Sequence, residues 1–460
     1  MGLNFKRTNI MEIQDITQVI NGYIEAKNSD AIRTALAEVH PSDIASIIQN
    51  INPDKQSYLL DSLDPETASE VYFELDVDQR EEIITELDDD KIADIADEME
   101  SDDAADLIGE LPEDTAETVL SKMDPEEVKD VEPLLLYPED SAGGIMQAEL
   151  VKVTNDTNVR DAINWIRLIA DDVEEFHGVY VTDSKNKLLG FIPLQKLIIA
   201  NPSSSANSIM EELEISVTPY IDQEEVADIF KKYDLVTLPV ISDEGILLGR
   251  ITADDVIDVI SEEAEEDIYQ YAGLKEHLHP IYTPTYERIK VRSPWLLLTL
   301  VGELLIALII IKVFEPTLEK FVILAAFMPA IMATGGNVGL QTTTIIVRSL
   351  GMGTIKTKQI LILIASEMKV GLALGLLCGI LSAIIGILIS YSEPQVLKLG
   401  LAIFLAMLSA TLATSFIGVA APIILQKLKF DPAASSDPFL TMFNDIFGSL
   451  FYLLIAMLIL

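Results

Sequence analysis

The sequence predicts an α-helical membrane protein with a large soluble part ahead of its membrane helices. Three observations predict this fold class. Five long apolar segments follow residue 293, and most exceed the ~20 residues that a helix needs to cross a bilayer. A pattern of short helices recurs through residues 1–130, and strand-like and helical stretches then alternate, in two copies, through residues 145–262. We therefore expect five transmembrane helices, an N-terminal α-solenoid and a tandem pair of α/β units.

Almost all the charge imbalance lies in the soluble part. The whole chain holds 31 basic and 74 acidic residues, a net charge of −43. From residue 293 onward there are 9 basic and 8 acidic residues, so the preceding 292 residues hold 22 basic and 66 acidic ones. Such a surface attracts cations and repels nucleic acid, so no nucleic acid partner is expected. Because aliphatic residues are interspersed with the acids, we expect a folded part rather than a disordered acidic tail.

Residues 1–130 carry an irregular repeat of short helical blocks. Each block begins with an Asp or Ser suited to helix capping, often beside Pro, and continues with Ala and aliphatic residues at helical spacing. Recurrence every ~10–14 residues predicts short helices stacked as a solenoid. Most of the Asp residues are then explained as caps. Clear examples are residues 41–51, 64–75, 101–111 and 112–123.

A second repeat follows. It consists of two pairs of similar stretches. VKVTNDTNVRDAINWI in the first copy is similar to SVTPYIDQEEVADIF in the second, and KLLGFIPLQKLI is similar to ILLGRITADDVI. This arrangement resembles a tandem pair of CBS domains, to which we assign residues 131–262. In CBS pairs that bind adenosine nucleotides, a Thr or Ser and an Asp three residues later hold the ribose and phosphates. Thr252 and Asp255 match this pair in the second copy, whereas the first copy has Pro193 and Lys196, so only the second copy offers ATP a matching pair. The alternative is a pair that acts only as a dimerising, metal-responsive hinge.

An acidic amphipathic helix is expected directly before the membrane part, in the stretch DDVIDVISEEAEEDIYQYAGL. Anionic headgroups would repel such a helix, so it is expected to pack on protein rather than on the lipid surface. A solvated charged face is the alternative. The acidic residues on or near one face are Asp255, Asp258, Glu262, Glu265 and Glu266.

The apolar segments cover residues 295–313, 321–347, 360–390, 399–425 and 438–460. With the N-terminus inside, the inner flanks hold eight Lys or Arg residues and the outer flanks hold three, which predicts a cytoplasmic N-terminus and an outer C-terminus. The one cysteine, Cys378, lies in an apolar segment, so no disulfide framework exists, as is usual for a cytoplasmic soluble part.

The second apolar segment contains a polar stripe. Asn337, Gln341, Thr344 and Arg348 are spaced so that they share one helix face. Polar groups at membrane depth need a partner, which a water-filled pore supplies. The alternative is that they hold neighbouring helices together.

The last apolar segment carries Asp445, and a carboxylate at membrane depth is costly and usually lines a path for ions. Thr441, Ser449 and Tyr452 share its helix face by spacing, and Asp437 lies eight residues earlier, near the expected inner mouth. Two other acids lie in apolar segments: Glu303, whose surroundings the sequence leaves open, and Glu367, for which a structural or snorkelling role is expected.

Taken together, the chain resembles the MgtE family of bacterial magnesium channels over essentially its whole length. The motifs that carry the resemblance are DSAGGIM at 140–146, TADDVIDVISEEAEEDI after the CBS pair, TGGNVGLQ at 334–341 and DPAASSDPFLTMFND at 431–445. The resemblance implies a homodimer with five membrane helices per chain, a pore along the dimer axis, and an acidic plug helix, here placed in residues 263–292 between the CBS pair and the membrane domain of residues 293–460.

The resemblance also implies residue roles. Asp445 matches the pore aspartate that binds hydrated Mg²⁺, and Asn337 lies in the matching TGGN segment. Asp437 is a departure, because the family usually has an uncharged residue there, and an extra carboxylate is expected to raise cation occupancy or alter selectivity. Carboxylates that would sense cytosolic Mg²⁺ fall on Asp102, Asp106, Glu224, Asp255, Asp258, Glu263, Glu266 and Asp267.

The sequence thus favours a passive, gated Mg²⁺ channel of the cell (inner) membrane that closes when cytosolic Mg²⁺ binds between acidic surfaces. Two alternatives stay open: a CBS-linked channel for Mn²⁺ or Co²⁺, and a non-conducting sensor of divalent ions. The chain holds no GxxxxGK[ST] motif and no nucleophile–base arrangement, so no enzyme is expected.

Overall fold

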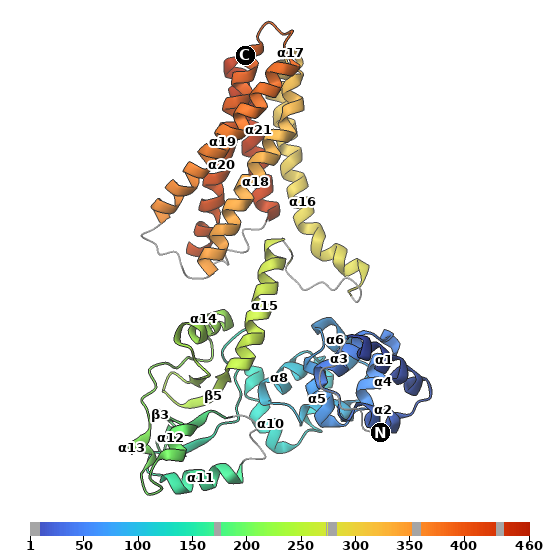
Figure 1. Ribbon diagram of the computed structural model, residues 1–460, viewed down its shortest axis with the longest axis vertical. Helices are drawn as coiled ribbons and strands as arrows, with labels where there is room; N and C mark the ends of the chain where they lie inside the picture. The colour runs from blue at the N-terminus through green and yellow to red at the C-terminus, as the bar shows by residue number, and fades with distance from the viewer. Residues whose placement is uncertain (1–9, 170–175, 273, 275–282, 352–359, 429–436) are drawn as a thin grey trace. The chain divides into compact units, whose positions relative to one another are not determined.

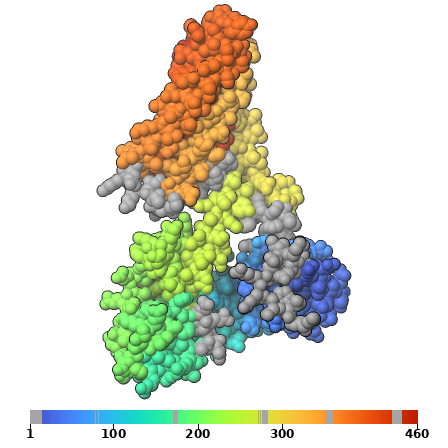
Figure 2. All heavy atoms as spheres, in the orientation of Figure 1, coloured from blue at the N-terminus to red at the C-terminus, as the bar shows by residue number. Residues whose placement is uncertain are grey.

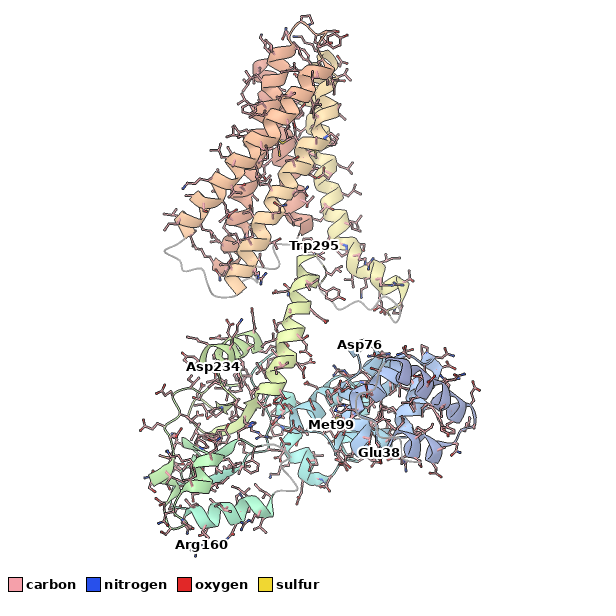
Figure 3. All side chains as sticks on the ribbon, in the orientation of Figure 1. Glu38, Asp76, Met99, Arg160, Asp234 and Trp295 are labelled. Atoms are coloured by element: carbon pink, nitrogen blue, oxygen red, sulfur yellow. The ribbon has the colours of Figure 1, made fainter. Side chains whose placement is uncertain are left out.

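The computed structural model describes residues 10–169, 176–272, 274, 283–351, 360–428 and 437–460 (Figure 1). The chain divides into two compact units, Met1–Glu263 and Ala264–Leu460, which we call the acidic unit and the helix bundle. Side chains that end in oxygen are dense over the acidic unit and sparse over the helix bundle (Figure 3). Each unit has its own hydrophobic core.

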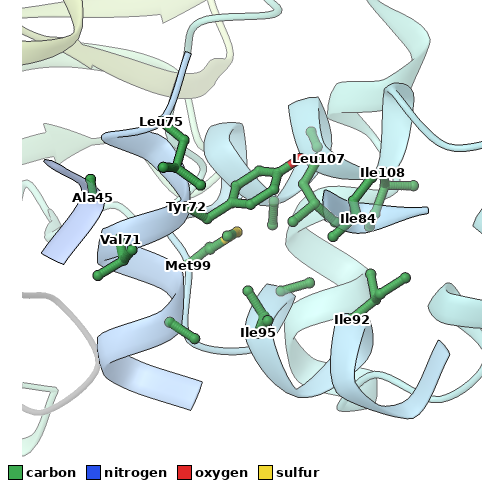
Figure 4. Close-up of a cluster of buried hydrophobic side chains, with 14 of the residues drawn as sticks. Ala45, Val71, Tyr72, Leu75, Ile84, Ile92, Ile95, Met99, Leu107 and Ile108 are labelled. Carbon is green, nitrogen blue, oxygen red and sulfur yellow. The ribbon is translucent and has the colours of Figure 1, made fainter. Parts of the chain in front are cut away.

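The first part of the acidic unit is a stack of short helices. Alternate helices pack on one another, α1 on α3, α3 on α5, α5 on α7 and α7 on α9, as the repeat predicts. The apolar side of each helix faces a common core around Tyr72, Ile95 and Leu107 (Figure 4). The elements are α1 (Ile10–Glu25), α2 (Ser29–Leu36), α3 (Pro41–Gln49), η1 (Pro53–Lys55), α4 (Gln56–Asp61), α5 (Pro65–Phe73), α6 (Val77–Ile84), α7 (Asp89–Ala96), α8 (Ser101–Gly109), α9 (Glu113–Leu120), α10 (Pro125–Val131) and η2 (Leu134–Leu136).

Caps and prolines explain several of these helix starts. Asp64 accepts from the backbone N–H of Thr67 and is followed by Pro65, and Asp124 caps α10 in the same way through Glu126. The sequence pattern was wrong at Ser101, which it treats as a cap. Glu100 occupies the cap position of α8 without a side-chain cap, and Ser101 is the first helical residue.

Two α/β copies complete the acidic unit. In the first copy, β1 (Lys152–Thr154) pairs in parallel with β2 (Gly178–Thr182), which pairs antiparallel with β3 (Leu188–Pro193). In the second copy, β4 (Thr237–Ile241) and β5 (Leu247–Thr252) pair antiparallel, and an isolated parallel bridge between Val217 and Val240 stands where β1 stands in the first copy. The helices are α11 (Val159–Leu168), α12 (Leu194–Ile199), α13 (Ala206–Ile209) and α14 (Gln223–Tyr233).

One continuous helix, α15 (Ala253–Tyr271), leaves the second copy. Val256 and Val259 are buried in the core of the acidic unit, whereas Ile260 and Ile268 are 48% and 69% exposed in the single chain. The aliphatic face expected on this helix is therefore only partly covered.

The helix bundle contains five helices long and apolar enough to cross a membrane among the described residues, at Thr285–Lys320, Ile323–Leu350, Ile360–Ile389, Val396–Lys427 and Thr441–Ile459. This confirms the five spans predicted from the sequence. The central helix of the bundle, α20, packs against α18, α19 and α21. Figure 2 shows the bundle as one packed body, coloured yellow to red. The elements are α16 (Thr285–Ile309), η3 (Ile310–Phe314), α17 (Glu315–Lys320), α18 (Ile323–Gly351), α19 (Ile360–Ile389), the central α20 (Val396–Lys427) and α21 (Asp437–Ile459).

Candidate functional site

Gln147 joins the acidic start of α8 to the start of α15. It is buried, and its Nε2 donates to Glu100 Oε2 at 2.6 Å and to Asp255 Oδ2 at 3.2 Å. Its Oε1 accepts from Arg250 Nε at 3.1 Å. One neutral side chain therefore holds a carboxylate of the helical repeat close to a carboxylate of the second α/β copy.

Glu149 brings a further carboxylate to the same end of α8. The backbone N–H of Ser101 donates to Glu149 Oε1 at 3.1 Å, and the Ser101 hydroxyl donates to Oε2 at 2.8 Å. The Ser101 hydroxyl also accepts from the backbone N–H of Ala148 at 2.8 Å. The N–H groups at a helix start favour negative charge, which explains why this acid is placed there.

The carboxyl groups around α8 lack enough positive charge to balance them. Asp102 is buried, and its Oδ1 has no hydrogen-bond partner among the described residues. Burial, and then the neighbouring Asp103 and Asp255, raise the pKa of Asp102 well above its ordinary value. Burial and the Asp255 charge raise the pKa of Glu100 to about 8 and that of Asp103 to about 7. These groups must take up protons or cations to stay packed together.

Asp106 and Asp258 extend this acidic cluster. Burial and then Glu139 and Asp103 raise the pKa of Asp106 to about 8, with Glu262 of α15 also contributing. Burial and then Glu74 raise the pKa of Asp258, and Arg80 opposes the shift. We use the name acidic cluster below for Glu100, Asp102, Asp103, Asp106, Glu149, Asp255 and Asp258.

The other predicted sensor residues lie elsewhere. Glu263 accepts from Gln223 Nε2 at 2.7 Å, which ties α15 to α14. Glu224 is exposed in the first turn of α14, where its backbone N–H donates to Asp222. Glu266 accepts from Gln270 one turn along α15, and Glu266 and Asp267 are both exposed.

Three members of the acidic cluster were missed in the sequence: Glu100, Asp103 and Glu149. The one available sequence signal for the cluster was the position of Gln147, which directly follows the DSAGGIM motif and links Glu100 to Asp255. Among the described residues, no three His, Cys, Asp or Glu side chains converge as the ligands of one ion.

Thr252 and Asp255, the pair expected to meet a nucleotide, contact each other. The Thr252 hydroxyl donates to Asp255 Oδ2, and the Thr252 backbone N–H donates to the same oxygen at 3.2 Å. Asp255 thus belongs both to this pair and to the acidic cluster. In the first copy, Lys196 Nζ pairs with Glu211 at 3.2 Å.

In the helix bundle, the polar stripe of α18 lies on the outer surface of the single chain. Asn337, Gln341, Thr344 and Arg348 are all exposed, while the glycine behind them faces inward. A Cβ at Gly339 would lie 2.6 Å from Asn444 Nδ2, so this glycine permits close packing between helices of one chain. Because an exposed polar stripe cannot face lipid tails, the single bundle is incomplete at this face.

The predicted polar face of α21 divides in two. Ser449 and Tyr452 are buried inside the bundle, where the Tyr452 hydroxyl donates to the carbonyl of Leu324 at 2.7 Å. Thr441 is exposed and Asp445 is half-buried. Ser449 and Tyr452 therefore belong to the packing of the bundle. Asp437 is the first residue of α21, but its side chain lies outside the described residues.

Asp445 has a close acidic neighbour. A side-chain hydrogen bond joins its carboxyl group to that of Glu303 on α16. A Cβ at Gly302 would lie 2.4 Å from Met442 Sδ, so this glycine lets α16 approach α21 one turn from Asp445. Glu303, whose surroundings the sequence left open, thus lies beside the carboxylate at membrane depth.

The bundle has five spanning helices, a half-buried carboxylate and an exposed polar stripe, and it is joined to an acidic unit with an α/β pair. These features define a membrane transport protein for cations. The family model for MgtE, described as a divalent cation transporter, matches residues 328–455. Two further family models match the soluble part: the MgtE intracellular N domain at residues 39–140 and the CBS domain at residues 206–262. The magnesium transporter MgtE of Bacillus subtilis is 34% identical over 73% of each chain, and that of Thermus thermophilus is 35% identical over 74% of each. The chain therefore belongs to the MgtE family.

A solved structure agrees with this assignment. The cytosolic domain of the Mg²⁺ channel MgtE, in complex with ATP, matches with a TM-score of 0.50 and 32% identity, covering 53% of this chain and 99% of that one. The predicted fold class, helical in the membrane with a helical N domain and CBS domains, is thereby confirmed. The relatives are transporters rather than enzymes, as the sequence predicts.

Proposed function

We propose that this chain forms a passive Mg²⁺ channel that closes when cytosolic Mg²⁺ neutralises the acidic cluster. The transport part rests on the exposed polar stripe of α18 in a bundle that also holds Asp445. A second copy of the chain placed against this stripe would enclose it, which gives a homodimer with a pore along its axis. The relatives' names, magnesium transporter, support Mg²⁺ as the transported ion.

The proposed path uses Asp445, Asn337 and Asp437. One ring of carboxylates that binds hydrated Mg²⁺ through its waters avoids the cost of removing the water shell. Entry needs no nucleotide hydrolysis, because a divalent cation gains ~4.6 kcal/mol at −100 mV, from ~2.3 kcal/mol per charge. The excess of basic residues on the inner flanks supports a cytoplasmic acidic unit, an outer C-terminus and a place in the cell (inner) membrane.

The proposed closure depends on repulsion between carboxylates, which bound Mg²⁺ removes. At low Mg²⁺ the carboxylates of the acidic cluster repel one another, and the unit loosens. At high Mg²⁺ the bound ions hold α8 and α15 together, and the pore closes. To change the ratio of closed to open channels from 1:99 to 99:1, Mg²⁺ must bind the closed state more tightly by ~5.5 kcal/mol in total. Several weak sites that share carboxylates supply this free energy together. The predicted Glu224, Glu263, Glu266 and Asp267 would join these sites once the subunits assemble.

ATP would bind through Thr252 and Asp255. The observation in favour is that both groups are present, in contact, at the start of α15, and that a similar cytosolic domain was solved with ATP. Because Asp255 is shared with the acidic cluster, a bound ribose would compete with Gln147 for its carboxylate. ATP is thus expected to change the Mg²⁺ level at which the channel closes.

The test is Mg²⁺ influx into proteoliposomes, with Mn²⁺ and Co²⁺ as competitors, for wild type and for a variant with Asp255, Asp258, Glu263 and Glu266 neutralised together. Influx that no longer stops at high internal Mg²⁺ in the variant supports the proposal. Closure that stays intact contradicts the gating part. Strong competition by Mn²⁺ or Co²⁺ would favour a channel for another divalent ion, and no influx at all would favour a non-conducting sensor.

A further inference from the structure

A layer of buried polar side chains lies between two apolar clusters inside the helix bundle. On α20, the apolar residues up to Ala410 belong to one cluster, and Val419 and Ile423 belong to another with Ile346 and Leu350 of α18. Between these two clusters lie five almost fully buried hydroxyl side chains, Thr411, Thr414 and Ser415 of α20 and Thr342 and Thr343 of α18. A polar layer closed on both sides by apolar side chains must satisfy its own polar groups.

Three of these hydroxyls are satisfied by backbone carbonyls. Thr343 donates to Gly418 O at 3.1 Å, Thr411 to Met407 O at 3.1 Å and Thr414 to Thr411 O at 3.2 Å. Ser415 differs, because its Oγ is fully buried and has no hydrogen-bond partner among the described residues. Its direction is known, since a Cβ at Gly371 of α19 would lie 2.3 Å from this oxygen.

Glu367 lies on the same face of α19, one turn before Gly371. Thr342 Oγ1 donates to Glu367 Oε2 at 3.3 Å, and Thr342 also faces Gly418, one turn along α20 from Ser415. Glu367 is half-buried and takes part in no ion pair among the described residues, while the nearby Lys369 is exposed. Glu367 thus faces the inside of the bundle and does not reach for the membrane surface as a snorkelling residue would.

We propose that Glu367, Thr342 and Ser415 form a binding site for a small monovalent cation such as Na⁺. All three provide oxygen atoms, which hard cations prefer. A single carboxylate is neutralised by one positive charge, whereas a divalent ion would leave a net positive charge in surroundings of low polarity. The bound cation would also accept the oxygen of Ser415 as a ligand and tie α18, α19 and α20 together.

The experiment measures the apparent melting temperature of the full chain, purified in detergent with EDTA at fixed pH. NaCl is titrated against choline chloride at constant ionic strength for wild type, Glu367→Gln and Ser415→Ala. Na⁺ at about ten times its Kd is expected to raise the melting temperature of the helix bundle in wild type by ~3 °C. The rise should vanish in Glu367→Gln and shrink in Ser415→Ala. Glu393→Gln, which changes an exposed acid between α19 and α20, should keep the full rise.

Two results would overturn the proposal. One is an equal Na⁺ effect in wild type and Glu367→Gln, which would place the ion elsewhere. The other is the absence of a Na⁺ effect in wild type; if Glu367→Gln is then also more stable than wild type, a proton neutralises this carboxyl. If Glu367→Gln fails to fold, binding of ²²Na⁺ to wild type and Ser415→Ala decides instead: the proposal requires binding to wild type and at least ~10-fold weaker binding to the variant.

Discussion

The acidic unit and the helix bundle both bury polar side chains, but they balance them differently. In the bundle, Thr411 and Thr414 donate to carbonyls of their own helix, so most of their polarity is satisfied locally. In the acidic unit, Asp102 and Asp103 are packed beside other carboxyl groups; Arg80 opposes the rise in the pKa of Asp103, and Arg250 opposes that of Glu100. The bundle therefore satisfies most of its buried hydroxyls itself, apart from that of Ser415, whereas the packing of the acidic unit depends on protons or cations that solution supplies.

The largest expected effect follows from removing the carboxylate at membrane depth. Asp445→Ala should lower Mg²⁺ influx into proteoliposomes by at least ~10-fold, because the proposed ring of carboxylates that concentrates the hydrated ion would be lost. Glu393→Ala, which removes an exposed acid, should leave influx unchanged. Influx that persists in Asp445→Ala would move the ion site to Glu303 or Asp437.

The second prediction concerns repulsion in the acidic unit. Asp102→Asn combined with Asp103→Asn removes two neighbouring acids, one buried and one half-buried, so the melting temperature of the full chain in EDTA should rise by ~2–4 °C. The further rise on adding Mg²⁺ should shrink. The matched control, Asp54→Asn with Asp243→Asn, changes two exposed acids and should alter neither value. A fall in the melting temperature of the test variant in EDTA would show that these carboxylates are already compensated.

The third prediction is a pH dependence. In the fold, the pKa of Glu100 and of Asp106 is raised to about 8, above ordinary values of 4.5 and 3.8. Acids with a raised pKa stabilise the fold fully below about pH 4, and this stabilisation is lost as pH rises through about 8. The melting temperature of the acidic unit in EDTA, measured by circular dichroism, should therefore fall as the pH rises from 5 to 8.5. Millimolar MgCl₂ should flatten the fall, and an unchanged slope would contradict cation binding at the cluster.

The smallest expected effect concerns packing in the bundle. Gly371→Ala places a Cβ 2.3 Å from Ser415 Oγ and should destabilise the bundle by about 1–3 kcal/mol, since α19 and α20 must move apart. Gly336→Ala, where no atom lies within 4 Å of the new Cβ, should be neutral or slightly stabilising. The comparison is made by thermal unfolding in detergent. Equal effects of the two changes would show that the α19–α20 contact tolerates displacement.

Much of the fold was predictable because it depends on local pattern. Apolar length predicted the five spans, and Pro beside an Asp cap predicted the start of α5. Helical spacing was less reliable for the candidate sites. It placed Thr441, Asp445, Ser449 and Tyr452 on one face, yet Ser449 and Tyr452 are buried in the bundle. Spacing defines a face, but the neighbouring helices decide which part of that face is covered.

The sequence by itself determined the number of spans, the division of charge, and the family, because each depends on composition and motifs along the chain. Only the tertiary structure decided which acids meet. It placed Gln147 between Glu100 and Asp255, residues more than 100 positions apart, and Glu303 beside Asp445. Electrostatic interaction falls with distance in space rather than along the chain, so the acids that share a cation or a proton are defined only once the helices pack.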